Sequence, residues 1–266
     1  MSAQQALSDE SILLREEQDG VVTLTLNRPG QFNTLSEEML DALQMALDDI
    51  TADEAVRCVV IAAAGRAFCA GHDLKQMRAN PRQEYYEALF AKCSRVMQAI
   101  VNLPVPVIAR VHGMATAAGC QLVASCDLAV AAESATFAVS GINVGLFCST
   151  PAVALSRNVS PKHAFDMLVT GRFITSAEAL SFGLVSRVAP DVELDEAVAA
   201  LTASICAKSP VAIRAGKAMF GRQRSMSLED AYAYAGNVMA CNMMAEDAAE
   251  GIDAFIGKRK PQWKGR

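Results

Sequence analysis

The amino-acid sequence predicts an α/β fold, in which β-strands and α-helices alternate along the chain. Two observations lead to this prediction. Apolar segments with strand-like patterns each run into a turn and then into a segment with helical spacing. The segment Arg57–Ala63 is also almost entirely apolar, as expected for a strand covered on both faces of a sheet. The chain has 266 residues, 52% of them hydrophobic, which is ample material for a large core.

The first predicted strand is Val21–Asn27, where apolar residues alternate with polar ones and form one buried face. Residues 28–30 contain proline and glycine and end this strand. Ser36 then has the position of a helix N-cap, because apolar residues recur at helical spacing through residues 39–50.

The second predicted strand is Arg57–Ala63, and it runs into the glycine-containing turn Gly65–Gly71. Residues 72–75 then open a short helix. Helical spacing continues through Tyr85–Leu103, and the third strand follows at Val105–Val111.

The stretch His112–Asp127 contains two glycines and four alanines and has no charged residue before Asp127. Small residues allow either tight helix packing or close approach of the backbone to a ligand, and the stretch alone favours packing. A helix that begins near Ala117–Gly119 would direct its free N–H groups toward the preceding turn, where they suit negative charge. Short strands follow at Asp127–Ala132 and Ala135–Val139.

The last third of the chain is predicted to be helical, because its apolar residues recur at helical spacing between glycine and proline stops. The predicted helices are Pro161–Leu168, Ser176–Phe182, Leu194–Ala207, Pro210–Phe220 and Ser227–Met244. Thr175 and Ser176 are alternative N-caps of the second of these helices.

Composition excludes several classes of function. A net charge of −5 and a pI of about 5.3 argue against a nucleic-acid-binding protein. The acidic N-terminus is unlike a secretory signal, and no apolar run is long enough to span a membrane. Eight cysteines without a CxxC pair are typical of free thiols in a reducing compartment. The three histidines form no metal-binding motif. We therefore expect a cytoplasmic protein without a metal site.

Two strand–turn–helix units, AFCAGHD and HGMATAAGC, are the main candidates for chemistry, because loops at strand ends are where open α/β sheets bind ligands. Two such turns side by side would direct two backbone N–H groups at one oxygen. Around these units the chain resembles the crotonase family, also called the enoyl-CoA hydratase/isomerase family. The matching segments are LNRPGQFNTLS, AFCAGHDLKQM, PVIARVHGMATAAGCQLVASCDLAVA, LVTGRFITSAEALSFGLVSRV and EGIDAFIGKRKPQW. Within the family, GINVGLFCSTP (Gly141–Pro151) and the two turns most resemble the enoyl-CoA hydratase domain-containing protein 3 group.

The resemblance implies a ClpP/crotonase-like spiral of β-β-α units that carries an acyl-CoA site, and we expect it to span residues 1–200. A helical region, residues 201–266, would follow and form trimers, often paired into hexamers. The ligand implied is an acyl-CoA thioester. Coenzyme A then enters as part of the substrate, and no separate cofactor is required.

The resemblance also implies site residues. Members of the family stabilise the thioester enolate oxygen with two backbone N–H groups, which fall here on His72 and Ala118. The matching contacts to coenzyme A fall on Arg28, Ala70, Asp73, Leu74, Lys75, and on Phe255 and Lys258 of the C-terminal tail. From the residues alone, a helix N-cap is the alternative for Asp73, and a solvated surface charge is the alternative for Arg28 and Lys258.

This chain departs from the family pattern at two positions. Hydratases of the family position water with two glutamates, and the matching residues here are Gln121 and Gly141. An amide can orient water but is not a useful base at neutral pH, and glycine can do neither. We therefore do not expect ordinary two-glutamate hydration.

Other polar residues offer no evident replacement for the glutamates. Structural roles are expected for Asp127 and His112, exposure to solvent for Glu133, and the His72 side chain borders the oxyanion turn but can point away from the ligand. The residues near the vacated second position that suit water or a polar acyl group are Ser140, Asn143, Ser149 and Thr150.

The leading hypothesis is therefore an acyl-CoA-binding protein of the enoyl-CoA hydratase/isomerase type that stabilises a thioester enolate. The alternative is a non-catalytic acyl-CoA-binding or assembly subunit. A nicotinamide-dependent enzyme is a weaker hypothesis, because no GxGxxG motif follows the first strand.

Overall fold

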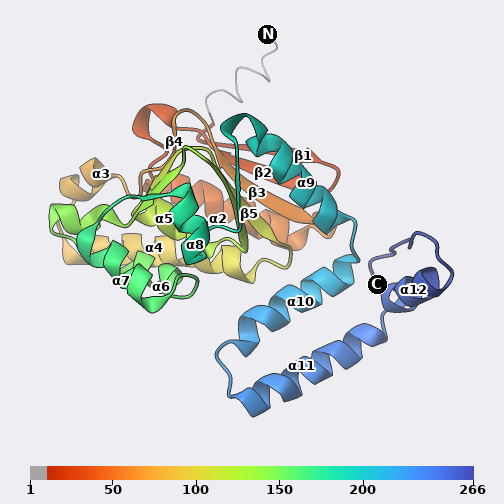
Figure 1. Ribbon diagram of the computed structural model, residues 1–266. Coiled ribbons are helices and arrows are strands. Elements are labelled where there is room, and N and C mark those ends of the chain that lie inside the picture. Colours follow the sequence, from red (N-terminus) through yellow and green to blue (C-terminus); the bar gives the residue numbers. More distant parts are fainter. Residues whose placement is uncertain (1–10) are drawn as a thin grey trace, which may run out of the picture.

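Two β-sheets form the centre of the molecule, which the computed structural model describes from residue 11 to residue 266 (Figure 1). As described within this range, the larger sheet has the strand order β1-β2-β3-β5-β7-β10 and the smaller sheet β4-β6-β8-β9. The strands of the larger sheet are Leu13–Gln18, Val21–Leu26, Cys58–Ala63, Val107–Val111, Leu128–Ala132 and Arg187–Ala189, in that order. Those of the smaller sheet are Ala67–Cys69, Met114–Thr116, Thr136–Ala138 and Ile174–Thr175.

Successive segments of the chain add one strand to each sheet. β3, β5 and β7 lie side by side in the larger sheet, while β4, β6 and β8 lie in the same order in the smaller one. These strands pair in parallel, as does β2 with β3, whereas β1 pairs antiparallel with β2 and β9 with β8. Helices connect the successive pairs of strands. The predicted spiral of β-β-α units is therefore confirmed.

The helices agree closely with the sequence patterns that predict them. The α-helices within the described residues are α2 (Glu37–Ala52), α3 (Leu74–Ala79), α4 (Gln83–Asn102), α5 (Ala118–Ser125), α6 (Ser149–Leu155), α7 (Pro161–Thr170), α8 (Ser176–Phe182), α9 (Leu194–Cys206), α10 (Pro210–Gln223), α11 (Leu228–Met243) and α12 (Glu246–Ile256). Short 3-10 turns are η1 (Pro29–Gln31), η2 (Ser140–Val144) and η3 (Asp191–Glu193). Ser36 caps α2, since its side chain accepts a hydrogen bond from the backbone N–H of Met39.

The short strands β4, β6, β9 and β10 are not predicted from the sequence, and neither β1 nor α12 is marked there as a separate element. β1 is a strand whose last four residues, Arg15–Gln18, are exposed and polar, so its sequence lacks an apolar alternation that would mark it. α12 follows α11 after only Met244 and Ala245, and it buries little more than Asp247 and Ala254. Both elements owe their order to pairing with other parts of the chain.

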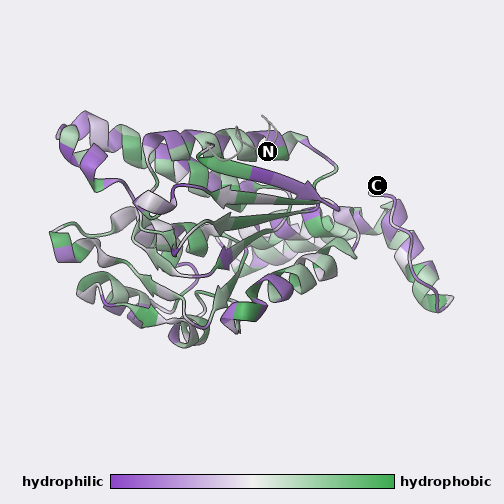
Figure 2. Cartoon of the chain, turned by 90° about the horizontal axis from the view of Figure 1, so that it is seen from above, coloured by the Kyte–Doolittle hydropathy of each residue, from purple (hydrophilic) through white to green (hydrophobic). Residues whose placement is uncertain are grey.

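The core lies between the sheets and their covering helices. Every residue of β3 is buried, as its apolar sequence predicts, and β2 buries alternate residues. Figure 2 shows mainly hydrophobic strands beside helices in which hydrophobic and hydrophilic residues are mixed. α2 and α4 pack together on this core and bury one apolar face each.

The C-terminal part of the chain leaves the core after α9, which packs on the larger sheet. α10 and α11 form an antiparallel pair that extends away from the sheets, and α12 lies beyond them (Figure 1). The predicted boundary between the core and the helical region at residue 200 stays a prediction. The chain turns away from the core between α9 and α10 (Figure 1). Among residues 11–266 no single helix has the length and hydropathy of a membrane span. The segments Asp191–Cys206 and Pro210–Gln223 meet both criteria only when they are taken together, and they are bent by 103° relative to each other.

An ion pair joins α10 to the core. The Nζ of Lys217 donates to the carbonyl oxygens of Ile100 and Val105 and lies 2.6 Å from Oδ2 of Asp127. Asp127 also accepts a hydrogen bond from the backbone N–H of Val107. These contacts fit the structural role expected for Asp127.

Gly119 sets how closely α5 packs on β4, because a Cβ at this position would lie 2.1 Å from the carbonyl oxygen of Cys69. We predict that Gly119→Ala lowers the free energy of unfolding by about 1–3 kcal/mol, since backbone must move to make room. Urea unfolding monitored by circular dichroism measures this change.

The matched control is Gly216→Ala in α10, where a Cβ would meet no heavy atom within 4 Å. It should leave stability unchanged or raise it by up to about 1 kcal/mol through helix propensity. Equal effects of the two substitutions would contradict the packing role of Gly119.

Candidate functional site

The two turns singled out from the sequence contact each other directly. Gly71, at the end of the first turn, has a φ of +89°, which favours glycine. A Cβ at Gly71 would lie 2.9 Å from Cβ of Ala117 and 3.1 Å from the backbone nitrogen of Ala118. The backbones of the two turns therefore meet without a side chain between them.

The first turn is held by the loop between β2 and α2. The backbone N–H of Leu35 donates to the carbonyl oxygen of Gly71 at 2.8 Å, and that of Ala70 donates to Phe32 at 3.0 Å. Asn33 is fully buried at the centre of this loop and satisfies its side chain with three backbone partners. It accepts from the N–H of Arg28 and donates to the carbonyl oxygens of Ala64 and Ala67, each at 2.8 Å.

Asn33 is a residue that the sequence analysis missed. A single asparagine in a loop is usually exposed, and nothing local distinguishes one that is fully buried. Its three partners lie as far as 34 residues away, so only the folded chain reveals its role.

The second turn is strained and held firmly. Ala117 has φ 51° and ψ −120°, a conformation that costs a non-glycine residue roughly 1–3 kcal/mol. Its N–H donates to the carbonyl oxygen of Ala138, and its own carbonyl accepts from Gln121. The hydroxyl of Thr116, one residue earlier, lies 2.7 Å from that of Ser140. These contacts fix the direction of the next N–H group, that of Ala118.

Neither candidate oxyanion donor is used by the protein itself. Within residues 11–266, the backbone N–H groups of His72 and Ala118 donate to no acceptor. Ala118 is the first residue of α5, so its N–H also lies at the positive end of the helix dipole. Two free donors on touching turns are an arrangement suited to an oxygen that develops negative charge.

The His72 side chain points into the protein. Its Nδ1 lies 3.2 Å from the carbonyl oxygen of Leu35, so Nδ1 carries the proton and donates. Its Nε2 is buried and has no hydrogen-bond partner among the described residues, and the ring packs against Phe90 with centroids 5.6 Å apart. Burial lowers the pKa of His72, which favours the neutral imidazole.

The two positions matched to glutamates carry no charge. Gln121 is only 4% exposed, and its Oε1 is buried without a hydrogen-bond partner in the described part of the chain. A Cβ on Gly141 would lie 2.6 Å from the carbonyl oxygen of Leu146 and 2.7 Å from Sγ of Cys148. A side chain at position 141 therefore requires the following loop to move.

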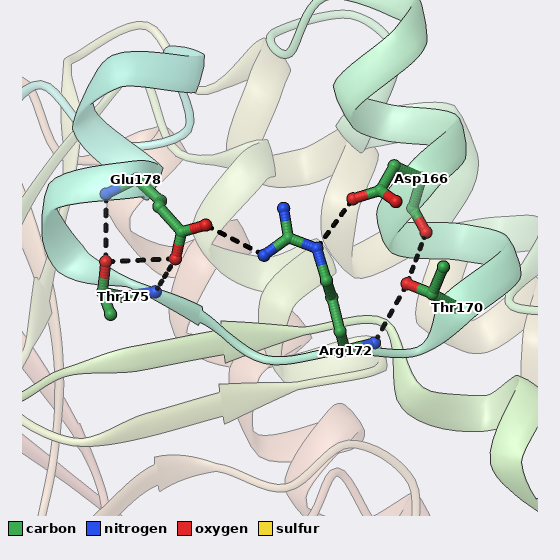
Figure 3. A network of polar contacts seen from close by, with 5 residues as sticks. All are labelled: Asp166, Thr170, Arg172, Thr175 and Glu178. Atoms are coloured by element: carbon green, nitrogen blue, oxygen red, sulfur yellow. Dashed lines mark hydrogen bonds and ion pairs between the residues drawn. The ribbon is translucent and has the colours of Figure 1, made fainter.

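Polar contacts around Arg172 hold the turn between α7 and β9 (Figure 3). Arg172 lies between Asp166 of α7 and Glu178 of α8, with nitrogen–oxygen distances of 2.7 and 2.9 Å. Gly171, the residue before it, abuts η2: a Cβ there would lie 2.7 Å from Ile142. Arg172 thus fixes the turn on which η2 rests.

A cleft of about 1180 Å³ lies between the core and α10. Gln121, Ala124 and Ser125 of α5 are part of its wall, whereas His72 and Ala118 of the two turns do not line it. Of the polar residues expected near the second vacated position, Thr150 also lines this cleft. Ser140 is instead bonded to Thr116, and Asn143 and Ser149 are exposed.

The residues matched to coenzyme A contacts fall into two separate groups. Asp73 caps α3 by accepting from the N–H groups of Lys75 and Gln76, which confirms the N-cap alternative. Leu74 and Lys75 are exposed beside it, while Ala70 and Arg28 are partly buried and joined through the loop around Asn33. Phe255 and Lys258 lie at the end of α12, at the opposite end of the molecule from α3 (Figure 1). One chain therefore does not bring the two groups together.

The other candidate side chains have structural surroundings. Nε2 of His112 lies 2.7 Å from the carbonyl oxygen of Gly65, which fits the structural role expected for it. Glu133 is exposed, as expected. Among residues 11–266, no three His, Cys, Asp or Glu side chains are grouped so that they could hold a metal ion.

Comparison with known proteins identifies relatives over nearly the whole chain. The sequence profile of the enoyl-CoA hydratase/isomerase family matches residues 16–266. The mitochondrial enoyl-CoA hydratase domain-containing protein 3 of Rattus norvegicus is 43% identical over 96% of this chain and 85% of its own length. The human protein of that name is 44% identical over 92% of this chain and 81% of its own length.

Solved structures agree with this result. An enoyl-CoA hydratase from Mycobacterium smegmatis superposes with a TM-score of 0.94 at 61% identity, covering 96% of this chain and 99% of its own. Human enoyl coenzyme A hydratase domain-containing protein 3 superposes with a TM-score of 0.93 at 44% identity, covering 95% of this chain and 100% of its own. The names of the curated relatives include "mitochondrial", and the cytoplasmic location expected from the sequence stays a prediction.

We predict that stability falls as the pH drops below about 6.5, the ordinary pKa of an unfolded histidine. Burial lowers the pKa of both His72 and His112 in the folded state. Between the folded and unfolded pKa values the unfolded chain binds more protons, so the free energy of unfolding rises with pH in this window. Urea unfolding at a series of pH values measures this slope.

The variant His72→Asn should reduce the slope of the free energy of unfolding against pH by an amount that corresponds to at most one bound proton. His163→Asn, which lies outside the two turns, serves as the control. An unchanged slope in the folded His72→Asn variant would contradict the buried, neutral state of His72.

Proposed function

Because the chain belongs to the enoyl-CoA hydratase/isomerase family, we propose that it binds an acyl-CoA thioester and stabilises the enolate of that thioester. The observation that carries this proposal is the contact between Gly71 and the turn at Ala117–Ala118. It brings the unused N–H groups of His72 and Ala118 to neighbouring backbone positions. The thioester oxygen accepts from both, and the negative charge that develops there is stabilised by preorganised dipoles. In other enzymes the loss of one such donor costs roughly 2.7–4 kcal/mol of barrier stabilisation.

Coenzyme A would then lie along the edge formed by the first turn and α3. The residues proposed to contact it from this chain are Arg28, Ala70, Asp73, Leu74 and Lys75. Phe255 and Lys258 would contribute from a second copy of the chain, since α12 lies far from α3 of its own chain (Figure 1). No resident cofactor is needed for this chemistry.

Exposed apolar side chains on α10–α12 support the assembly of several copies. Those that are more than half exposed are Phe220, Leu228, Tyr232, Met239, Met243, Met244, Phe255 and Ile256. Large apolar side chains that gather on one part of a surface favour burial against another protein. We propose a homotrimer or a dimer of trimers.

The reaction differs from ordinary two-glutamate hydration in this proposal. Gln121 and Gly141 offer no base, and the described carboxylate nearest to α5 in sequence, Asp127, is paired with Lys217. The enzyme would therefore act on an enolate in a reaction other than hydration, within the lyase and isomerase chemistry of fatty acyl thioesters. The absence of a carboxylate at positions 121 and 141 also favours a second candidate, a non-catalytic acyl-CoA-binding or assembly subunit.

Calorimetric titration with acyl-CoA thioesters, followed by turnover assays, tests the proposal. We expect saturable binding of butyryl-CoA and turnover of at least one member of a panel of enoyl-, dienoyl-, β-keto- and malonyl-type thioesters. Binding without any turnover would support the non-catalytic subunit instead. Absence of binding by the folded protein would contradict both.

We predict that Gln121→Glu raises crotonyl-CoA hydration by about tenfold, because it supplies one carboxylate where a general base would act. The gain should stay below the roughly 10²–10⁴-fold that a complete general base contributes, since position 141 remains glycine. Adding Gly141→Glu is expected to help little, because the side chain would meet the carbonyl oxygen of Leu146.

The matched control is Gln98→Glu, which adds a carboxylate on α4 in the wall of the same cleft. It should not increase hydration. If Gln121→Glu folds and binds butyryl-CoA yet gains nothing over this control, the match of Gln121 to the family position is wrong.

A further inference from the structure

The peptide group between Gly71 and His72 is held on its carbonyl side by Leu35. The backbone N–H of Leu35, a fully buried residue, donates to the carbonyl oxygen of Gly71 at 2.8 Å. The Gly71–His72 peptide is trans, so its C=O and its N–H point in opposite directions. The N–H of His72 therefore points away from Leu35, and within residues 11–266 it donates to no acceptor.

One hydrogen bond at a carbonyl oxygen does not fix the plane of a peptide group, because the group can still pivot about that bond. Gly71 resists such a pivot little, since it has no Cβ and a φ of +89°. Hydrogen bonds weaken steeply when the donor turns away from the acceptor, so a pivot would reduce the stabilisation of a charged oxygen. A second contact, on the His72 side of the peptide, is therefore needed to hold the donor in line.

The side chain of His72 makes this second contact. Its Nδ1 lies 3.2 Å from the carbonyl oxygen of Leu35, so both polar backbone groups of Leu35 are bound to residues 71 and 72. Leu35 and His72 also form an isolated parallel β-bridge. The imidazole ring packs against Phe90 of α4, with centroids 5.6 Å apart. One polar and one aromatic contact thus restrict the side chain of His72, and with it the backbone that bears the N–H group.

The two ring nitrogens of His72 have different surroundings. Nε2 is buried and has no hydrogen-bond partner in the described part of the chain. Burial lowers the pKa of His72, so the ring is neutral at neutral pH and carries one proton, on the Nδ1 that donates to Leu35. The single hydrogen bond of the ring therefore goes to the residue that also holds the carbonyl side of the donor peptide.

The second predicted donor, the N–H of Ala118, is held in a different way. The carbonyl oxygen of Ala117, in the same peptide group, accepts from the backbone N–H of Gln121. This contact involves backbone atoms alone, and Ala118 has no polar side chain. A side-chain substitution can therefore disturb the first donor while the second keeps its geometry.

Resting on the proposed function, we propose that the imidazole of His72 is a positioning residue for the first oxyanion donor. Its Nδ1–H group, bound to Leu35, holds the backbone N–H of the same residue in line with the thioester oxygen. The imidazole itself touches no reacting atom and exchanges no proton with the substrate. Its effect falls mainly on the enolate, because hydrogen bonds to a charged oxygen are stronger and depend more on alignment than those to the neutral thioester.

The ionisation of bound acetoacetyl-CoA tests this role without the need for turnover. The enolate of this β-keto thioester absorbs in the ultraviolet, so the pH at which it forms reports how well the protein stabilises the charge. Bound acetoacetyl-CoA should ionise at a lower pH than the free thioester. His72→Gln moves the side-chain amide one bond beyond the Nδ1 position and should raise the ionisation pH by about one unit, or tenfold. This is part of the roughly 10²–10³-fold that loss of a whole donor costs.

His72→Asn is the conservative counterpart, because its side-chain nitrogen can take the place of Nδ1 and donate to Leu35. It should raise the ionisation pH clearly less than His72→Gln does. In both variants the affinity for butyryl-CoA, which stays neutral, should change less than the ionisation of acetoacetyl-CoA. His163→Gln, on α7 and outside the two turns, is the matched control and should behave as the unsubstituted protein does.

A second measurement needs no variant. The chain has three histidines, and long-range ¹H–¹⁵N NMR spectra show which ring nitrogen of each carries the proton. We expect the proton of His72 on Nδ1 at neutral pH. A proton on Nε2 would overturn the inference, as would equal ionisation pH values for acetoacetyl-CoA bound to His72→Gln and to His72→Asn.

These failures are distinct from failure of the proposed function. If the unsubstituted protein lowers the ionisation pH of acetoacetyl-CoA, enolate stabilisation stands whatever the two His72 variants do. If the folded protein binds neither acetoacetyl-CoA nor butyryl-CoA, the proposed function is wrong and this inference is wrong with it.

Discussion

Backbone-to-backbone contact at three glycines is the constraint on which the site depends. A Cβ would lie 2.1 Å from a carbonyl oxygen at Gly119 and 2.5 Å from one at Gly113, and 3.1 Å from a backbone nitrogen at Gly71. The smaller sheet and α5 therefore meet more closely than any side chain allows. Only this approach brings two N–H groups from turns more than forty residues apart in sequence to neighbouring positions.

Such an approach has an energetic cost, and the surrounding contacts offset it. Ala117 adopts a conformation that favours glycine, yet hydrogen bonds to Ala138 and Gln121 hold it there. Buried Asn33 satisfies three backbone groups of the loops that carry the first turn. A strained backbone conformation that is held in place by surrounding contacts is typical of functional sites. The geometry is thus consistent with a preorganised oxyanion site.

Electrostatics distinguishes this site from one built for hydration. Positions 121 and 141 are neutral, the Nε2 of His72 is buried and desolvation lowers the pKa of this histidine, and Asp127 is paired with Lys217. Arg157 and Arg224 line the separate cleft beside α10 and form no ion pair in the described part of the chain. The two turns therefore combine N–H groups that the protein leaves unused with an absence of basic carboxylates. Stabilising an enolate and hydrating a double bond are separable tasks, and the function proposed for this chain is the first of them.

The sequence by itself determined the local structure and the family. Some features depend only on residues that are close in sequence, so the sequence predicts them. They are the alternation in the strands, the N-cap at Ser36 and the helix ends at Gly171 and Gly183. The two small-residue turns and the neutral positions 121 and 141 were visible for the same reason.

The tertiary structure alone decided which distant groups meet. Strand β1 escaped detection because pairing with β2, not an apolar pattern, orders it. The partners of Asn33, the cancellation of Asp127 by Lys217 90 residues away, and the separation of α12 from α3 all depend on the path of the whole chain. Hydrogen bonds and ion pairs are short-ranged, so residue types reveal the capacity for them, but only the fold decides which are formed and which charges remain for a ligand.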